Sequence, residues 1–165
     1  MRLSCSGIEE GVNMQKIKFA HTNIIAVDWR KVSRFYIEVF GCVPIGPARK
    51  LSGLNISEGT GVETPSIVGL HLRLPGCGEE GPTLEIFQYK ESLATPETYG
   101  NSRGLSHIAF EVDNVEEFCV KVVRAGGWML GKLVRQQIEG VGVCTFIYVR
   151  DPERNIIEIQ KWERS

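Results

Sequence analysis

The 165-residue chain repeats one pattern twice, and this repeat constrains its fold more than any other feature. In each half, an apolar, β-branched segment precedes an aspartate, and a helical stripe of apolar residues then runs to a glycine. Asp28 precedes Gly41 by 13 residues, and Asp113 precedes Gly126 by the same 13 residues. Further apolar segments of strand length follow in both halves. Because an internal repeat indicates two copies of one structural unit, each half is predicted to fold as a strand, a helix and three strands.

The periodicity of apolar residues predicts the elements of the first unit. Alternation and β-branching indicate strands, whereas apolar spacings of three and four indicate a helix. The predicted strands are residues 17–27, 42–45, 67–74 and 83–89, and the predicted helix is 29–40. Asp28 is the expected N-cap of this helix, and Gly41 is the expected end. Residues 46–64, which are rich in Gly, Ser, Pro and Asn, are expected to form a long binding loop.

The same periodicity predicts the elements of the second unit. Its predicted strands are residues 104–112, 129–135, 143–150 and 156–162. Asp113 and Glu116 have the spacing of a capping pair, so the helix is expected to begin just after Asp113. Gly126 and Gly127 are expected to end it.

These elements predict an α+β protein of two βαβββ modules in tandem within one structural domain. Each module is expected to be a curled mixed sheet with a helix, and the two modules are expected to enclose one cavity. The predicted boundaries are a flexible leader at 1–16, the first module at 17–89, a polar linker at 90–103 and the second module at 104–165.

Charge and composition exclude several classes of protein. With 19 basic and 20 acidic residues, the net charge is -1, so the chain lacks the basic surplus of a dedicated nucleic-acid binder. It has no apolar run near the ~20 residues that a membrane span needs. The N-terminus has no apolar core of a secretion signal, and the five cysteines are scattered without a CxxC pair. We therefore expect a cytoplasmic protein with free thiols.

Histidine and glutamate occur at equivalent positions of the two units. His21 and His107 lie in the early strands, and Glu85 and Glu158 lie in the last strands. Taken singly, each is more simply a hydrogen-bonded core histidine or a solvent-facing glutamate. If the units meet about a pseudo-twofold axis, however, the four side chains converge. Two imidazoles and two carboxylates suit Zn, Ni, Co, Fe or Mn, and such a mixed set leaves positions open for substrate.

Strand alternation adds candidate neighbours to this site, because residues two or four apart share a face. The neighbours expected to line the cavity and contact substrate are Asn23, Phe87, Tyr89, Glu111 and Gln160. His71, the third histidine, lies in a hairpin strand. The sequence leaves two interpretations of it open, an acid–base group in the cavity or a surface histidine.

Four segments between residues 17 and 162 resemble the modules of the vicinal oxygen chelate superfamily, the glyoxalase/bleomycin resistance/dioxygenase fold. They are FAHTNIIAVDWRKVSRFYIEVFG, TLEIFQY, GLSHIAFEVDNVEEF and YVRDPERNIIEIQKW. The most specific piece is DPERNIIE, in which Arg154 stands where the family usually has Gly. The resemblance implies a metal site made of His21, Glu85, His107 and Glu158.

The resemblance also implies an activity like that of glyoxalase I (lactoylglutathione lyase) or methylmalonyl-CoA epimerase. A divalent metal, Zn, Ni, Co or Mn, would stabilise the enediolate that forms when a proton leaves carbon next to a carbonyl. Glu158 is the expected base, and Glu85 is the expected ligand and second proton shuttle. The substrate is expected to be a small molecule such as a glutathione or CoA conjugate. The modules are expected to complete one cavity within a chain or to exchange between the chains of a homodimer.

Two other functions remain open. His21, His107 and Glu158 alone would form the Fe(II) triad of an extradiol-type dioxygenase, which leaves Glu85 spare. A thiol transferase that inactivates an antibiotic uses a similar set of three ligands. A non-catalytic protein that sequesters a ligand, like the bleomycin-resistance proteins, needs no metal.

Overall fold

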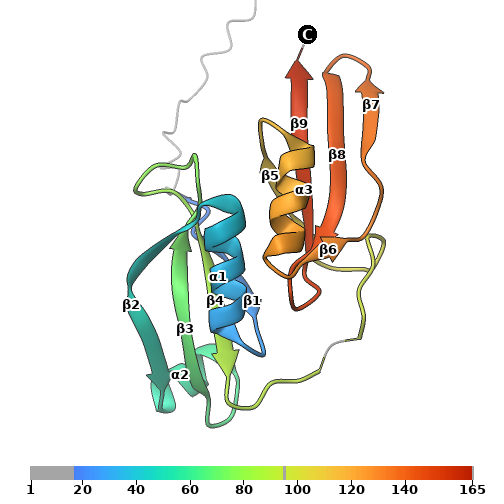
Figure 1. The fold of residues 1–165 in the computed structure, drawn as a ribbon. Coiled ribbons are helices and arrows are strands. Elements are labelled where there is room, and N and C mark those ends of the chain that lie inside the picture. The colour runs from blue at the N-terminus through green and yellow to red at the C-terminus, as the bar shows by residue number, and fades with distance from the viewer. Residues whose placement is uncertain (1–16, 95, 165) are drawn as a thin grey trace, which may run out of the picture.

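The computed structural model describes residues 17–94 and 96–164, which form two modules of one design (Figure 1). In each module a helix lies against one face of a sheet. This architecture confirms the predicted α+β class and the tandem modules. The leader expected at 1–16 lies outside the described residues. No helix of the described part is long and apolar enough to cross a membrane.

The first module has a four-stranded mixed sheet of order β1-β4-β3-β2. Strand β1 is parallel to β4, and the other neighbours are antiparallel. Its elements are β1 (His21–Ile25), α1 (Trp29–Phe40), β2 (Val43–Ser52), α2 (Leu54–Thr60), β3 (Ser66–Arg73) and β4 (Thr83–Tyr89).

The second module repeats this topology. Its sheet has the order β5-β9-β8-β6, with β7 paired to β8, and β5 is parallel to β9. Its elements are β5 (Ile108–Glu111), α3 (Val115–Arg124), β6 (Trp128–Met129), β7 (Val134–Ile138), β8 (Gly142–Arg150) and β9 (Ile156–Arg164).

Helix α1 has the predicted bounds, and local interactions explain both ends. The Asp28 side chain accepts hydrogen bonds from two backbone N–H groups of the first turn, which have no partner within the helix. Gly41 ends the helix in the left-handed conformation, with φ of 69°, which glycine adopts without steric cost. The apolar stripe of α1 is buried, and Val32, Phe35 and Tyr36 are almost completely inaccessible.

Three predicted elements of the chain are wrong. The strand predicted at 129–135 is instead two short strands, β6 and β7, with residues 130–133 between them outside any strand. The expected loop at 46–64 instead contains most of β2 and all of α2. Strand β2 was missed because it is an edge strand with a mostly exposed surface, so it lacks apolar alternation, and its pairing shifts register between Ile45 and Arg49. The N-cap of α3 is Asn114 rather than Asp113. The Asn114 side chain accepts a hydrogen bond from the backbone N–H of Glu117. Both residues are good caps, and the helix begins one position later than expected.

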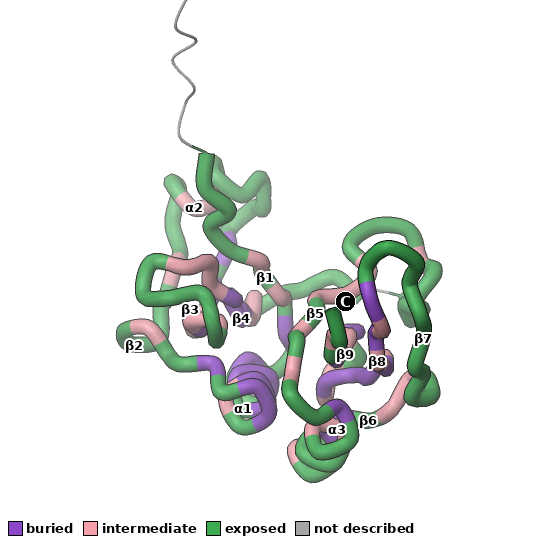
Figure 2. The backbone as a smooth tube through the Cα atoms, turned by 90° about the horizontal axis from the view of Figure 1, so that it is seen from above, coloured by how far each residue is buried: buried purple, intermediate pink, exposed green. Residues whose placement is uncertain are grey.

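One hydrophobic core joins the modules. The ring of Phe40 on α1 stacks on that of Phe110 on β5, with centroids 4.0 Å apart, and it also packs near Phe118 on α3. The Tyr36 hydroxyl lies 3.4 Å from the buried carboxylate of Asp151 in the second module. Figure 2 shows the buried residues gathered on α1 and on the strands beside the helices. These contacts determine how the modules are placed within a chain.

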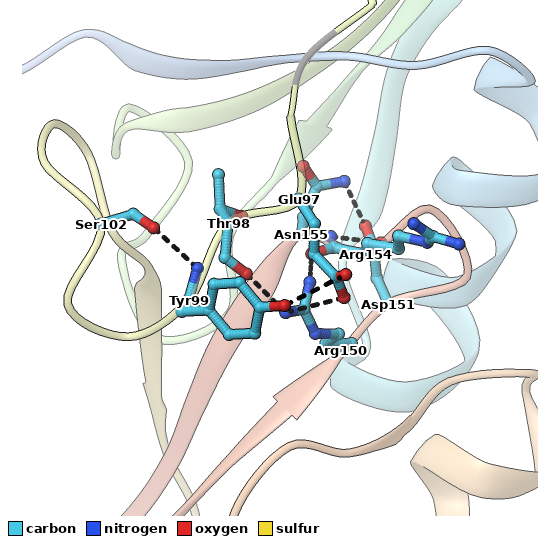
Figure 3. Close-up of polar contacts among 8 residues, drawn as sticks. All are labelled: Glu97, Thr98, Tyr99, Ser102, Arg150, Asp151, Arg154 and Asn155. Atoms are coloured by element: carbon cyan, nitrogen blue, oxygen red, sulfur yellow. Dashed lines mark hydrogen bonds and ion pairs between the residues drawn. The ribbon is translucent and has the colours of Figure 1, made fainter.

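The linker between the modules is held by Arg150 at the end of β8 (Figure 3). The Arg150 side chain is 2% exposed and lies 3.7 Å from the carboxylate of Glu97. Its guanidinium donates hydrogen bonds to the carbonyl oxygens of Thr98 and Arg154. The Tyr99 ring lies 5.9 Å from the guanidinium. Because a buried guanidinium needs partners for its donors, this contact ties linker residues to the second module.

Replacing Arg150 with Met is therefore expected to destabilise the protein by about 2–4 kcal/mol, because two charge-assisted hydrogen bonds are lost. Arg135→Met is the matched control. Arg135 lies 2.9 Å from Glu163, but both side chains are more than half exposed, so this loss should stay below about 1 kcal/mol. Urea unfolding measures both values. Equal destabilisation by the two substitutions would show that the linker contact contributes no more than a surface ion pair.

Candidate active site

Glu85 lies on β4 and points away from helix α1. Its neighbours Leu84 and Ile86 are fully buried in the core between the sheet and the helix. Since side chains alternate along a strand, Glu85 lies on the opposite face, where it is 8% exposed. A carboxylate at such a position requires polar partners.

Both carboxylate oxygens of Glu85 have polar neighbours from adjacent strands. Oε2 accepts a hydrogen bond of 3.1 Å from the Asn23 amide and lies 3.5 Å from Nε2 of His21. Oε1 lies 2.9 Å from Nε2 of His71. The structure thus brings His21, Asn23 and Glu85 together and adds His71 to them.

His71 is buried rather than on the surface, with 8% exposure, so the surface interpretation is wrong. It pairs directly with Glu85 across the β3–β4 ladder. Its Nε2 is fully buried and is not aligned with Glu85 for a regular hydrogen bond, despite the short distance. Burial lowers the pKa of His71, the charge of Glu85 raises it, and Arg49 and His21 lower it further. The imidazole is therefore neutral near neutral pH.

Glu158 on β9 is the equivalent carboxylate of the second module. Its Oε2 lies 3.0 Å from Nε2 of His107, and its side chain is 16% exposed. Tyr148 pairs with Glu158 across the β8–β9 ladder, and its ring centroid lies 4.8 Å from that of His107. Burial raises the pKa of Tyr148, and the charge of Glu158 and a hydrogen bond with it raise this pKa further.

Tyr148 is a site residue that was not predicted from the sequence, although the repeat contains a signal for it. His71 and Tyr148 occupy the same place in the two modules, directly across the ladder from a glutamate. Aligning the third strands of the repeat as well as the first and last would have identified this residue.

The remaining residues that were predicted to contact substrate have different neighbours from one another. Phe87 and Tyr89 follow Glu85 at alternate positions of β4, and the Phe87 ring lies 5.5 Å from that of His71. Gln160 accepts a hydrogen bond of 3.2 Å from the indole N–H of Trp162. Glu111, which pairs with Gln160, forms a surface ion pair of 3.4 Å with Arg164.

The four predicted ligands form two pairs rather than one group. His21 lies beside Glu85 in the first module, and His107 lies beside Glu158 in the second. Among residues 17–94 and 96–164, no three His, Cys, Asp or Glu side chains are grouped so that they could hold a metal ion. The expected convergence on one point therefore does not occur within the single chain. Within the chain, the modules contact each other through the aromatic core and through hydrogen bonds from the backbone N–H groups of Val27 and Asp28 to the Glu153 carboxylate.

The spacing of each pair is nevertheless close to that of two ligands on one metal ion. Two donor atoms that each lie about 2.1 Å from one metal are about 3.0–3.4 Å apart in octahedral or tetrahedral geometry. The measured N···O separations are 3.5 Å for His21 and Glu85 and 3.0 Å for His107 and Glu158. The His107–Glu158 pair thus has the spacing of one edge of a mixed nitrogen and oxygen site, and the His21–Glu85 pair has the same donors at a separation just above this range.

A cavity of about 630 Å³ lies between the modules. It is lined by β1, the linker, the start of β5 and the turn between β8 and β9. Asn23, the partner of Glu85, and His107, the partner of Glu158, both belong to its wall. Residues of both clusters therefore border one space of the size that small-molecule sites have.

Comparisons with known proteins agree on one family. The model of the "Glyoxalase/Bleomycin resistance protein/Dioxygenase superfamily" matches residues 18–159. No curated protein sequence matches the chain.

Solved structures show the same fold. A glyoxalase family protein from Bacillus cereus is 16% identical, with a TM-score of 0.77 over 92% of this chain and 97% of that one. A glyoxalase family protein from Enterococcus faecalis is 24% identical, with a TM-score of 0.57 over 89% of this chain and 98% of that one.

The lowered pKa of His71 predicts a pH-dependent stability of the metal-free protein. Between the lowered pKa and the ordinary value of 6.5, the unfolded chain binds more protons than the folded chain. The free energy of unfolding is therefore expected to fall as the pH drops below about 6.5. In His71→Gln, urea unfolding from about pH 7.5 to about pH 5.5 should show a smaller fall. An equal fall in both proteins would contradict the burial of a neutral imidazole.

Proposed function

The chain belongs to the glyoxalase/bleomycin resistance protein/dioxygenase superfamily, and on that premise we propose that it is a metal-dependent lyase, isomerase or epimerase of the glyoxalase I or methylmalonyl-CoA epimerase type. It would remove a proton from carbon next to a carbonyl. One observation carries this proposal. Two His–Glu pairs occupy equivalent positions of the repeat, and their donor atoms are 3.5 Å and 3.0 Å apart, close to the separation at a metal-site edge.

His21, Glu85, His107 and Glu158 are the proposed ligands of a divalent Zn, Ni, Co or Mn ion. Imidazole and carboxylate donors suit these ions, and four protein ligands leave room for substrate oxygens on a six-coordinate ion. When bound, the metal would act as a Lewis acid that stabilises negative charge on the substrate oxygens.

Glu158 is the proposed base, and the two carboxylates differ in a way that supports this role. Glu85 has three polar neighbours, namely His21, Asn23 and His71. Glu158 has one at a short distance, His107, and it faces Tyr148 across the β8–β9 ladder. The less constrained carboxylate is better able to approach a substrate proton, and its low exposure limits competition from water. Glu85 would then serve mainly as a ligand and second shuttle.

The proposed substrates are thioesters or hemithioacetals with a glutathione or CoA tail. The cavity of about 630 Å³ beside Asn23 and His107 supports this proposal, because it has room for part of such a tail. The four cysteines that the structure describes are free thiols, which supports a reducing, cytoplasmic location.

A homodimer is proposed to join the two pairs into one site, with His21 and Glu85 from one chain and His107 and Glu158 from the other. The His21 side chain is 48% exposed and so accessible to a second chain. Strands β1 and β5 are both sheet edges. Phe19 and Val27, on either side of β1, are 66% and 77% exposed, and a second copy would bury this apolar surface.

Elemental analysis of protein purified without a chelator or His-tag tests the metal proposal. We expect about one Zn, Ni, Co or Mn ion per chain, and we expect His107→Ala to lose it because a two-His, two-carboxylate set is broken. Iron in the wild type would redirect the assays to catechol turnover under oxygen. The absence of metal even after reconstitution would overturn the catalytic proposal and leave a ligand-sequestering protein.

Co-expression of His21→Ala and His107→Ala chains tests the shared site. Each variant alone is expected to bind no metal. In a mixed dimer, one site keeps both histidines and the other loses both. Random assortment makes half of the dimers mixed, and each mixed dimer has one intact site out of two. About one quarter of the wild-type metal content should therefore return. No recovery in dimers shown to be mixed would place all four ligands of each site in a single chain.

A further inference from the structure

We propose that His71 and Tyr148 are matched positioning residues, each of which orients one carboxylate of the metal site from the neighbouring strand. This inference rests on the proposed function, because it concerns the carboxylates of the same site. Neither residue belongs to the proposed ligand set.

The ladder geometry places the two residues in equivalent positions. His71 on β3 lies directly opposite Glu85 on β4, and Tyr148 on β8 lies directly opposite Glu158 on β9. Side chains directly opposite in an antiparallel pair share a face and have Cβ atoms about 4.5–5.5 Å apart. Each carboxylate is therefore held between two strands, with its histidine partner on one side and the positioning residue on the other.

In the first module, the two oxygens of Glu85 face different partners. Oε2 faces His21 and Asn23, whereas Oε1 faces only His71 among the polar contacts of the described residues. The Nε2 atom of His71 is buried without an aligned partner, and an unpaired buried donor is unfavourable. Since Oε1 lies only 2.9 Å away, a small rotation of either side chain aligns them. His71 then holds Oε1 and leaves Oε2 directed at His21.

In the second module, Tyr148 contacts both members of the pair. Its side chain stands directly opposite Glu158 in the β8–β9 ladder, and its ring packs 4.8 Å from the ring of His107. The phenol thus restricts the carboxylate and the imidazole together. The chemical difference between an imidazole and a phenol also breaks the symmetry of the repeat, so that Glu85 and Glu158 need not behave alike.

Hydrogen-bond partners behind metal ligands typically change metal affinity by roughly 10- to 100-fold when they are removed. The test is Co(II) binding, measured by competition with a chelator and by visible absorption of the bound ion. Tyr148→Phe and His71→Ala are each expected to weaken Co(II) binding roughly 10- to 100-fold and to change the spectrum. His71→Gln, whose amide nitrogen replaces Nε2 as a donor, should recover part of the affinity.

Tyr99→Phe is the control, because Tyr99 lies in the linker and is 53% exposed, and its hydroxyl donates a hydrogen bond to Glu97 rather than to a carboxylate of the proposed site. It should bind Co(II) as the wild type does. Thermal unfolding of the metal-free variants checks that each is folded. Wild-type affinity and an unchanged spectrum in both Tyr148→Phe and His71→Ala would overturn the inference while leaving the proposed function intact.

Failure of the proposed function gives a different result, namely a wild-type protein that binds no Co(II). The positioning role is then tested in metal-free crystal structures. In Tyr148→Phe, we expect the Glu158 carboxylate to leave hydrogen-bond distance of His107, and in His71→Ala we expect Glu85 to turn away from His21. Unmoved carboxylates in both structures would overturn the inference.

Discussion

The packing of Phe40 against Phe110 is the contact on which the arrangement of the whole chain depends. Each module has its own sheet, and in the described part of the chain no strand of one sheet pairs with a strand of the other. Nothing in the backbone ladders therefore places one module against the other. The aromatic contact between α1 and β5 does so, together with the buried interaction of Tyr36 with Asp151 and the hydrogen bonds that Glu153 accepts from the backbone N–H groups of Val27 and Asp28. Because burial of aromatic rings is strongly favourable and their packing is directional, this core holds the modules in one orientation.

That orientation has a consequence for the chemistry. Each module completes one His–Glu pair by itself, because neighbouring strands bring the two residues together. Joining the two pairs requires a second contact surface, which the core of the single chain does not supply. The anchoring of the linker by Arg150 further limits how the modules can rearrange. The proposed homodimer meets this requirement without disturbing the core.

The two modules share a fold but differ in the side chains that surround their glutamates. The residue opposite each glutamate is an imidazole in one module and a phenol in the other. Asn23 supports Glu85, whereas the equivalent position beside Glu158 is Ala109. Such differences are expected where two copies of one unit have taken different roles in a shared site. They also explain why pattern matching between the halves found the glutamates but overlooked Tyr148.

The sequence by itself determined the modules, helix α1 and the equivalent places of two histidines and two glutamates in the repeat. These depend on local periodicity, on capping and on strand alternation, all of which act over short stretches of chain. It did not reveal β2, whose residues are mostly exposed and lack an apolar pattern. Only the tertiary structure decided that His71 is buried beside Glu85 and that the two pairs stay apart within one chain. The physical reason is that strand register and aromatic packing between distant segments set these positions, and no local pattern encodes either.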